Sequence, residues 1–339
     1  MVPKRNPDWR ELAAAKLMSS VLPEVELEGD VLVMLEGQPE VAAIARSLGA
    51  RPHSWHRMAL RDRRATAWPP AGSFDAATLR LPKAKDELQM SVHAAAVSLR
   101  IGARLWVYGA GDEGIRSARP LLEPLFKEVT TVSTGSRCRV LGAVRSSVST
   151  GLKGALTDWT QITNMMMCDS FRDWISYPGV FAHGKVDSGT MTLIEVLSSL
   201  PRRARVLDFA CGSGLIGATV LSKDSSASVE FLDADAVALK AVIQNVPDAR
   251  VILSDGYSGV RGHSYDMIVS NPPYHEGKAE SRQMLERLLS GAPRHLMPGG
   301  ALLFVTQRRQ RVKSLLASRF PVTEAVLDRG VHRVWRGEL

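Results

Sequence analysis

Cysteine is scarce in this 339-residue chain, which has Cys138, Cys168 and Cys211. Their number is odd and their spacing matches no metal-binding pattern, so we expect neither a disulfide framework nor a metal site, and a reducing compartment is favoured. Long apolar runs are also missing, since none approaches the roughly 20 residues that a membrane helix needs. The first 23 residues mix acidic and basic side chains without an apolar core, unlike a secretory signal. We therefore expect a cytoplasmic protein without membrane contact, or a mitochondrial or plastid one if the host is a eukaryote.

Acidic side chains are in the minority, because 35 Asp and Glu residues stand against 43 Lys and Arg residues, a net charge of +8. This balance favours a polyanionic partner such as nucleic acid, although a merely basic surface would give the same count. Two basic runs suit RNA phosphates, and the first surrounds Trp55. They comprise Arg51, His53, His56, Arg57, Arg61, Arg63 and Arg64, and then Arg308, Arg309, Arg311, Lys313 and Arg319.

Short apolar runs alternate with helical patterns in the second half of the chain. The expected strands are 205–210, 229–232, 250–253, 265–270 and 301–306, and the expected helices are 215–221, 236–245 and 281–295. Such alternation predicts an α/β fold with a parallel sheet covered on both faces. Ligands in these sheets bind beyond the carboxyl ends of the strands, and the chain length favours a second domain before this one.

Polar residues and glycines follow these strands in an order that suits a nucleoside-bearing cofactor. Gly212 and Gly214 let the backbone approach a ligand closely. Asp208 can receive an ammonium group, Asp233 can take two ribose hydroxyls, and Asp255 can accept from an adenine amine. Each aspartate alone would more often cap a helix or a turn, but their joint order favours a site.

The stretch Asn271-Pro272-Pro273-Tyr274 follows the strand 265–270 and supplies a pocket for an amine on a flat ring. The Asn271 side-chain oxygen and the Pro272 carbonyl can both accept from one NH2 group, while the prolines stiffen the backbone and Tyr274 can stack. Beside the glycine loop, this predicts an S-adenosylmethionine-dependent amino methyltransferase. A nicotinamide enzyme fits less well, because hydride transfer does not use an amine clamp.

Three segments resemble the bacterial ribosomal RNA guanine-N2 methyltransferases, both the small-subunit enzyme and its large-subunit relative. They are Tyr177-Pro178-Gly179-Val180-Phe181, Asp187-Ser188-Gly189-Thr190 and the turn from Asn271 to Lys278. The resemblance implies two tandem Rossmann-like methyltransferase domains made by duplication, with the N-terminal one degenerate. It further implies S-adenosylmethionine as cofactor, ribosomal RNA or a ribosomal subunit as partner, and a monomer. Asp187, Gly189, Cys211 and Asn271 join the cofactor site through this resemblance, although Cys211 has no base beside it in sequence.

An internal repeat supports the duplication, since Ser73-Phe74-Asp75 parallels Ser264-Tyr265-Asp266 and 31–34 parallels 206–209. In the first copy, Arg80 or Leu81 stands where the second has Asn271, and 35–39 replaces the glycine loop. The segment 109–114 matches a dinucleotide fingerprint by pattern, but under this alignment it follows the fifth strand and is better explained as a turn.

The sequence thus predicts a degenerate, RNA-docking domain over 1–145, a linker and hairpin over 146–176, and a catalytic domain over 177–339. The expected reaction is methylation of the exocyclic N2 of a guanine in ribosomal RNA. The alternatives are an N5-glutamine methyltransferase, an N6-adenine methyltransferase, and a non-catalytic ribosome-assembly factor that binds RNA with the same fold.

Overall fold

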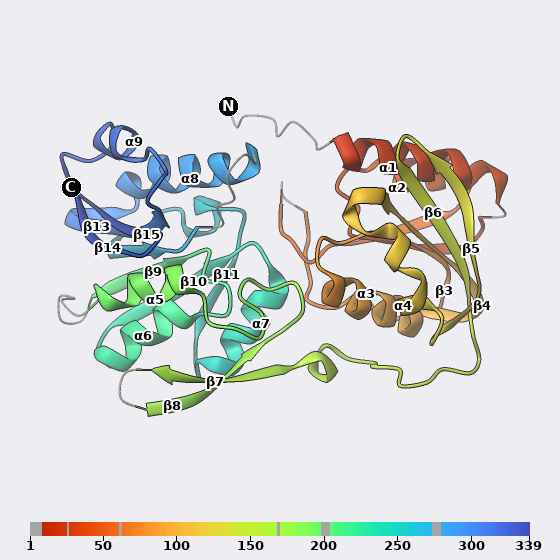
Figure 1. Ribbon diagram of the computed structural model, residues 1–339, viewed down its shortest axis with the longest axis horizontal. Coiled ribbons are helices and arrows are strands. Elements are labelled where there is room, and N and C mark those ends of the chain that lie inside the picture. The colour runs from red at the N-terminus through yellow and green to blue at the C-terminus, as the bar shows by residue number, and fades with distance from the viewer. Residues whose placement is uncertain (1–8, 26, 61–62, 168–169, 198–203, 273–278) are drawn as a thin grey trace. The chain divides into compact units, whose positions relative to one another are not determined.

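The structure is a computed structural model that describes residues 9–25, 27–60, 63–167, 170–197, 204–272 and 279–339. It divides into two compact units (Figure 1). The first unit comprises the chain through Arg57 together with Arg64–Trp159, and the second comprises Met58–Arg63 together with Thr160–Leu339. No helix within the described residues is long and apolar enough to cross a membrane.

The second unit is built on a seven-stranded sheet with the order β11-β10-β9-β12-β13-β15-β14. The strands are β9 (Arg205–Phe209), β10 (Ser228–Asp233), β11 (Arg250–Leu253), β12 (Tyr265–Ser270), β13 (Leu296–Gln307), β14 (Val322–Arg329) and β15 (His332–Glu338). Pairing is parallel from β11 through β13 and antiparallel along β15 and β14. The carboxyl ends of the parallel strands therefore meet at one edge, as the sequence predicts.

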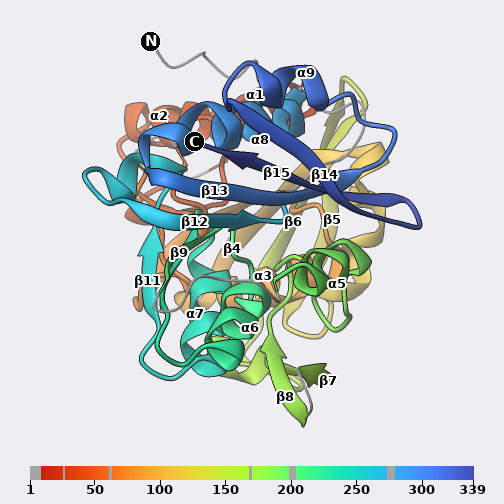
Figure 2. The same cartoon turned by 90° about the vertical axis from the view of Figure 1, so that its left-hand side faces the viewer.

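Helices cover both faces of this sheet. One face carries α5 (Ser188–Glu195), α6 (Leu215–Lys223) and α7 (Ala236–Asn245), and the other carries α8 (Ala279–Gly291) and α9 (Lys313–Ala317), as both views show (Figures 1 and 2). Successive strand residues point to opposite faces, so Val206 packs in the core under α6 while Leu207 packs in the core under α8. Burial of each such side chain contributes roughly 1.5–3 kcal/mol, which is why these strands consist of continuous apolar runs.

The first unit repeats this design with one strand fewer among the described residues. Its strands are β1 (Asp30–Met34), β2 (Arg51–Trp55), β3 (Phe74–Arg80), β4 (Leu99–Ala110), β5 (Phe126–Gly135) and β6 (Cys138–Arg145), and its helices are α1 (Trp9–Val21), α2 (Glu40–Ser47), α3 (Lys85–Ser98) and α4 (Arg119–Leu122). The order β2-β1-β3-β4-β6-β5 equals that of the second sheet without a counterpart of β11. The predicted pair of Rossmann-like domains is therefore confirmed.

The paired aspartates of the internal repeat have the same contact in both units. Asp75 Oδ2 accepts the Asp30 N–H at 2.7 Å, and Asp266 Oδ2 accepts the Arg205 N–H at 2.7 Å. In each case an aspartate at the start of one strand satisfies the first donor of its neighbour. The register also shifts at the same place, between Phe74 and Ala76 in one unit and between Tyr265 and Met267 in the other.

Charged side chains occupy the part of the first unit that corresponds to the glycine loop and Asn271. Glu36 is buried, and its carboxylate accepts the N–H groups of Val41 and Ala42 at the start of α2. Strand register aligns Ala76 with Met267, which places Arg80 at the position of Asn271. Arg80 is buried and forms an ion pair with Glu113 at 2.7 Å. At the position where the second unit has the Asn271 amide, the first unit therefore has the Arg80 guanidinium, whose charge is neutralised by Glu113.

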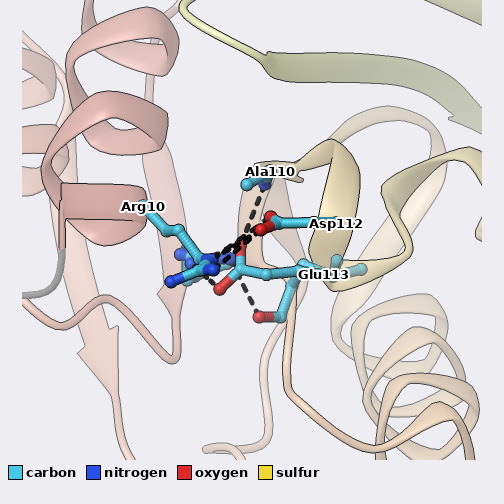
Figure 3. A network of polar contacts seen from close by, with 6 residues as sticks. Arg10, Ala110, Asp112 and Glu113 are labelled. Carbon is cyan, nitrogen blue, oxygen red and sulfur yellow. Dashed lines mark hydrogen bonds and ion pairs between the residues drawn. The ribbon is translucent and has the colours of Figure 1, made fainter.

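The segment 109–114, which matches a dinucleotide fingerprint by pattern, forms a turn at the end of β4, the counterpart of β13, which is the fifth strand of the second sheet, as predicted. Glu113 Oε2 accepts the Ala110 N–H at 2.9 Å, and the Asp112 carboxylate accepts hydrogen bonds from Nε and Nη2 of Arg10, the shortest of them 2.7 Å (Figure 3). Gly114 has φ +94°, a left-handed conformation that suits glycine. The acidic side chains of this turn thus bind arginines of their own unit.

The predicted linker over 146–176 is shared between the two units. Its first part joins the first unit, because the Arg145 guanidinium donates to the carbonyl oxygens of Leu125 and Ser146, and the Lys153 N–H donates to His93 Nδ1 at 3.0 Å. Its second part is the hairpin of β7 (Gln161–Met167) and β8 (Ser170–Ser176), which belongs to the second unit.

One short segment from the first half of the sequence is a member of the second unit. Ala59 N–H donates to the Ala234 carbonyl at 2.7 Å, and Met58 forms an antiparallel bridge with Asp235. This segment therefore extends the backbone hydrogen bonding just beyond the carboxyl end of β10, beside Asp233.

Candidate active site

A cavity opens at the carboxyl edge of the second sheet, and the described residues that line it all belong to the second unit. The glycine loop contributes Cys211, Gly212 and Ser213, and Asn271 follows β12. Asp187 and Thr190 at the start of α5 also line it, as do Thr163, Met165, Trp174 and Ser176 of the hairpin. The loop, the amide and the hairpin are thus brought together from three separate stretches of sequence.

Two glycines of the loop adopt the left-handed backbone conformation, which residues with a Cβ rarely adopt. Gly212 has φ +55° and Gly214 has φ +88°. A Cβ on Gly214 would lie 3.1 Å from Val242 of α7, so this glycine permits the close packing of two elements. Gly212 instead lines the cavity, where its lack of a side chain leaves room for a ligand.

Asp208 is fully buried on β9, three residues before the glycine loop, and is not among the residues that line the cavity. Its Oδ2 accepts the Gly217 N–H at 2.8 Å, and its Oδ1 has no hydrogen-bond partner among the described residues. Burial, with a smaller contribution from the charge of Asp233, raises the pKa of Asp208 to about 7. A buried acceptor without a partner suits the predicted ammonium group, reached directly or through a water molecule.

Asp233 ends β10 and is half-buried. Its carboxylate accepts the Gly212 N–H at 2.8 Å and the Asp235 N–H at 2.9 Å, and burial followed by the charge of Asp235 raises the pKa of Asp233 to about 6. Each carboxylate oxygen can accept a second bond, so two ribose hydroxyls remain compatible with this geometry. Asp233 therefore links the glycine loop to the predicted ribose position.

Asp255 follows β11, where its Oδ1 accepts from Arg287 of α8 at 2.8 Å. An adenine amine would therefore share this carboxylate with a guanidinium, and the adenine contact stays a prediction.

Cys211 is buried, and burial with the nearby carboxylates raises the pKa of its thiol well above its usual value. The thiol consequently stays protonated at neutral pH and supplies no nucleophile. Within the described residues no group of His, Cys, Asp or Glu side chains could hold a metal ion.

Asn271 lies between β12 and the helix α5. Its Nδ2 donates to Asp187 Oδ2 at 2.8 Å and to Thr190 Oγ1 at 2.8 Å. Asp187 also caps α5, because the same Oδ2 accepts the Thr190 N–H at 2.7 Å. The structure thus places Asp187, predicted as a cofactor contact, against the amide of Asn271.

Four predicted site residues remain, of which two are among the described residues and two are not. Gly189 is buried, and a Cβ there would lie 3.0 Å from Asp187 Oδ2 and 3.3 Å from His332. Gly189 therefore makes room for the capping carboxylate of α5. Pro272 is buried directly after Asn271. Pro273 and Tyr274 lie outside the described residues.

Sequence reasoning missed the hairpin as a wall of the site. Trp174 Nε1 donates to Ser213 Oγ at 2.9 Å, and Asn245 Nδ2 donates to the Ser213 carbonyl at 3.0 Å and to the Ile175 carbonyl at 2.9 Å. These bonds attach the hairpin and the end of α7 to the glycine loop. Met165, Met167 and Trp174 of the hairpin are buried, but the uninterrupted run Met165-Met166-Met167 shows no alternation of apolar and polar residues, so no local pattern indicated this wall.

The strand order, the glycine loop and the acid that ends the second strand of the sheet define the class of protein, an S-adenosylmethionine-dependent methyltransferase fold. The family model "Methyltransferase small domain" matches residues 173–336, and "Methyltransferase small domain N-terminal" matches residues 42–161. A ribosomal RNA small subunit methyltransferase C from Ectopseudomonas mendocina is 33% identical over 300 residues, which cover 84% of this chain and 88% of the relative. One from Pseudomonas fluorescens is 34% identical over 255 residues, 73% and 74% of the two chains. The chain belongs to the ribosomal RNA small subunit methyltransferase C family.

A solved structure shares this two-unit fold along nearly its whole length. It is a 16S rRNA N2 methyltransferase from T. thermophilus in complex with AdoMet and guanosine, 22% identical, with a TM-score of 0.83 over 96% of this chain and 91% of that one.

Proposed function

We propose that this protein transfers a methyl group from S-adenosylmethionine to the exocyclic N2 of a guanine in the 16S ribosomal RNA. The observation that carries the proposal is the position of the Asn271 amide, which lines the same cavity as the glycine loop. Family membership and the complex of the similar structure with AdoMet and guanosine support the same cofactor and base.

Bound S-adenosylmethionine supplies an electrophilic methyl group on a sulfonium, so the protein has mainly to position the two reactants. Asp208 and Asp233 would hold the ammonium and ribose ends, and Gly212 gives the cofactor room. Asn271 Oδ1 and the Pro272 carbonyl would accept the two N–H groups of the guanine amine and direct its lone pair at the methyl carbon. The N–C bond forms as the S–C bond breaks, and the amine then loses a proton to water. A guanine in a helix would have to be flipped out to reach the cavity.

The exposed basic cluster after β13 supports contact with RNA phosphates. Arg308, Arg309, Arg311, Lys313 and Arg319 are all exposed. The cluster begins at the carboxyl end of β13, the neighbour of β12 in the parallel sheet, and therefore on the sheet edge where Asn271 follows β12. We propose this cluster as the main phosphate-binding surface of the second unit.

The basic run over 51–64 is less available to RNA than its sequence indicates. Arg51 and His53 both bind Asp30, each at 2.8 Å, and the buried Arg57 binds Glu87 at 3.0 Å. Arg64 is exposed, and Arg61 lies outside the described residues. Met58–Arg63 belongs to the second unit, so docking of RNA by the first unit remains a proposal that relies on Arg64.

The test is mass spectrometry of nucleosides from 16S rRNA of cells with and without the gene, followed by transfer from labelled S-adenosylmethionine in vitro. Loss of N2-methylguanosine in the deletion strain, and its restoration by the purified protein, is the expected result. N6-methyladenosine among these nucleosides would support the adenine alternative, whereas an unchanged nucleoside profile would support the glutamine methyltransferase or the non-catalytic alternative. We also propose that the protein acts as a cytoplasmic monomer, since the scarcity of cysteine favours a reducing compartment and the resemblance of the sequence implies a monomer.

A further inference from the structure

The Asn271 side-chain amide donates two hydrogen bonds to residues at the start of α5, Asp187 and Thr190. We propose that Asp187 and Thr190 are positioning residues that fix the orientation of this amide, so that its Oδ1 faces the substrate amine. The inference rests on the proposed function and adds to it two residues whose contribution to the reaction passes through Asn271.

Both protons of the amide are used in this arrangement. A primary amide has two N–H donors on Nδ2 and one acceptor oxygen. One acceptor is Asp187 Oδ2 at 2.8 Å, and the other is Thr190 Oγ1 at 2.8 Å. The amide therefore has Oδ1 left for a substrate, and an acceptor is what an exocyclic amine requires.

The opposite orientation of the amide is disfavoured by the same contacts. If the amide turned over, its Oδ1 would lie where Nδ2 now meets the Asp187 carboxylate, and two acceptors would face each other. Asp187 Oδ2 already accepts the Thr190 N–H at 2.7 Å, so this oxygen acts as an acceptor in the fold. The hydrogen-bond network itself thus assigns the amide orientation.

The two positioning residues are themselves held firmly. Thr190 is buried, and Asp187 is the N-cap of α5, whose Leu193 packs in the core of the second unit. The charge of Asp187 also polarises the amide, which makes its oxygen a better acceptor than an isolated amide oxygen. Rigid support of this kind matters because small misplacement of a reacting group can cost about a hundredfold in rate.

A role in cofactor binding is the competing explanation, because Asp187 and Thr190 both line the cavity. The two roles affect different constants. Loss of a cofactor contact raises the Kd of S-adenosylmethionine, whereas loss of amide orientation lowers kcat and leaves that Kd unchanged.

The first test replaces Thr190 by Val, which keeps the shape and removes the acceptor. We expect kcat for methyl transfer to 16S rRNA to fall about ten- to hundredfold, with the Kd for S-adenosylmethionine by calorimetry unchanged. Thr190→Ser should restore most of the rate. Thr192→Val is the matched control, because Thr192 is buried on the same helix and donates to the Ser188 carbonyl instead. A raised Kd with unchanged kcat, or full activity in Thr190→Val, overturns the inference.

The second test exchanges the two partners. Asn271→Asp alone would place two carboxylates in contact and should be nearly inactive. Adding Asp187→Asn restores a donor between the two positions, so the double variant should regain at least about tenfold in kcat, by analogy with other coupled neighbours. Failure of this rescue in a double variant that still binds S-adenosylmethionine would refute the orientation role. Methyl transfer by the wild type to another atom or base would refute the proposed function, while the comparison of variants would still decide this inference.

Discussion

Replacement of the buried Asp208 by Asn should change how the stability of the second unit depends on pH. The pKa of Asp208 rises from 3.8 to about 7 in the fold, mainly through burial. Between these values the folded protein binds a proton that the unfolded chain has released. The free energy of unfolding should therefore fall as pH rises through this window, by up to ~1.4 kcal/mol for each pH unit.

The magnitude follows from the same two values. The interval from 3.8 to about 7 corresponds to roughly 4 kcal/mol of lost stability once the carboxylate is ionised. An asparagine can still accept the Gly217 N–H, but its NH2 group replaces the Asp208 oxygen that has no partner, which costs about 1–3 kcal/mol. We therefore expect Asp208→Asn to stabilise the second unit at pH 8 by about 1–3 kcal/mol and to weaken the pH dependence.

The assay is calorimetric unfolding of the full chain at several pH values from 5 to 8 without cofactor. The transition of the second unit is the one that added S-adenosylmethionine moves to higher temperature. Asp248→Asn is the control, because Asp248 is an exposed aspartate of the same unit. Equal slopes for wild type and Asp208→Asn between pH 5 and 7, or a variant less stable at pH 8, would show that the burial argument is wrong.

Three further outcomes are expected. Calorimetric titration should find one S-adenosylmethionine site per chain, and Asp233→Ala should weaken it strongly. A second site would contradict the loss of the glycine loop in the first unit. Asn271→Ala should abolish methyl transfer and leave the Kd of the cofactor nearly unchanged. The lost transition-state stabilisation should be about 3–4 kcal/mol, by analogy with the removal of a preorganised hydrogen-bond donor. Activity within about tenfold of wild type would exclude the amine clamp. Changing Arg309, Arg311 and Lys313 to Ser should flatten the salt dependence of RNA affinity by up to about 0.9 for each lost phosphate contact in a duplex, whereas identical slopes would place the RNA elsewhere.

Much of the fold could be predicted because its signals are local. Continuous apolar strands, the glycines after β9 and the alternation with helices indicated the sheet without any knowledge of distant contacts. The duplication could be found because Asp75 and Asp266 occur at matching positions of the repeat. Each accepts a hydrogen bond from the first backbone N–H of the neighbouring strand. Asp75 therefore makes the repeat visible in the sequence although the first unit has neither the glycine loop nor the amide of the second.

The parts that sequence reasoning missed depend on partners far away in the chain. Asp187 lies 84 positions before Asn271, and no local pattern shows that their side chains meet. Arg57 looks like a surface cation in a basic run, yet Glu87 neutralises it inside the first unit. The segment 146–176 has the composition of a linker, but Trp174 in its hairpin binds Ser213 of the glycine loop.

The membership of Met58–Arg63 in the second unit has a consequence for synthesis on the ribosome. The chain of the first unit is complete once residue 159 has emerged, so that unit can fold while the rest is still being made. The backbone partners of Met58 and Ala59 are Asp235 and Ala234, which are translated about 175 residues later. Met58 and Ala59 therefore lack these backbone partners until β10 and the two residues after it have been synthesised. A fragment that begins at Thr160 would lack this partner, and the backbone next to the Asp233 carboxylate would be left without its bridge.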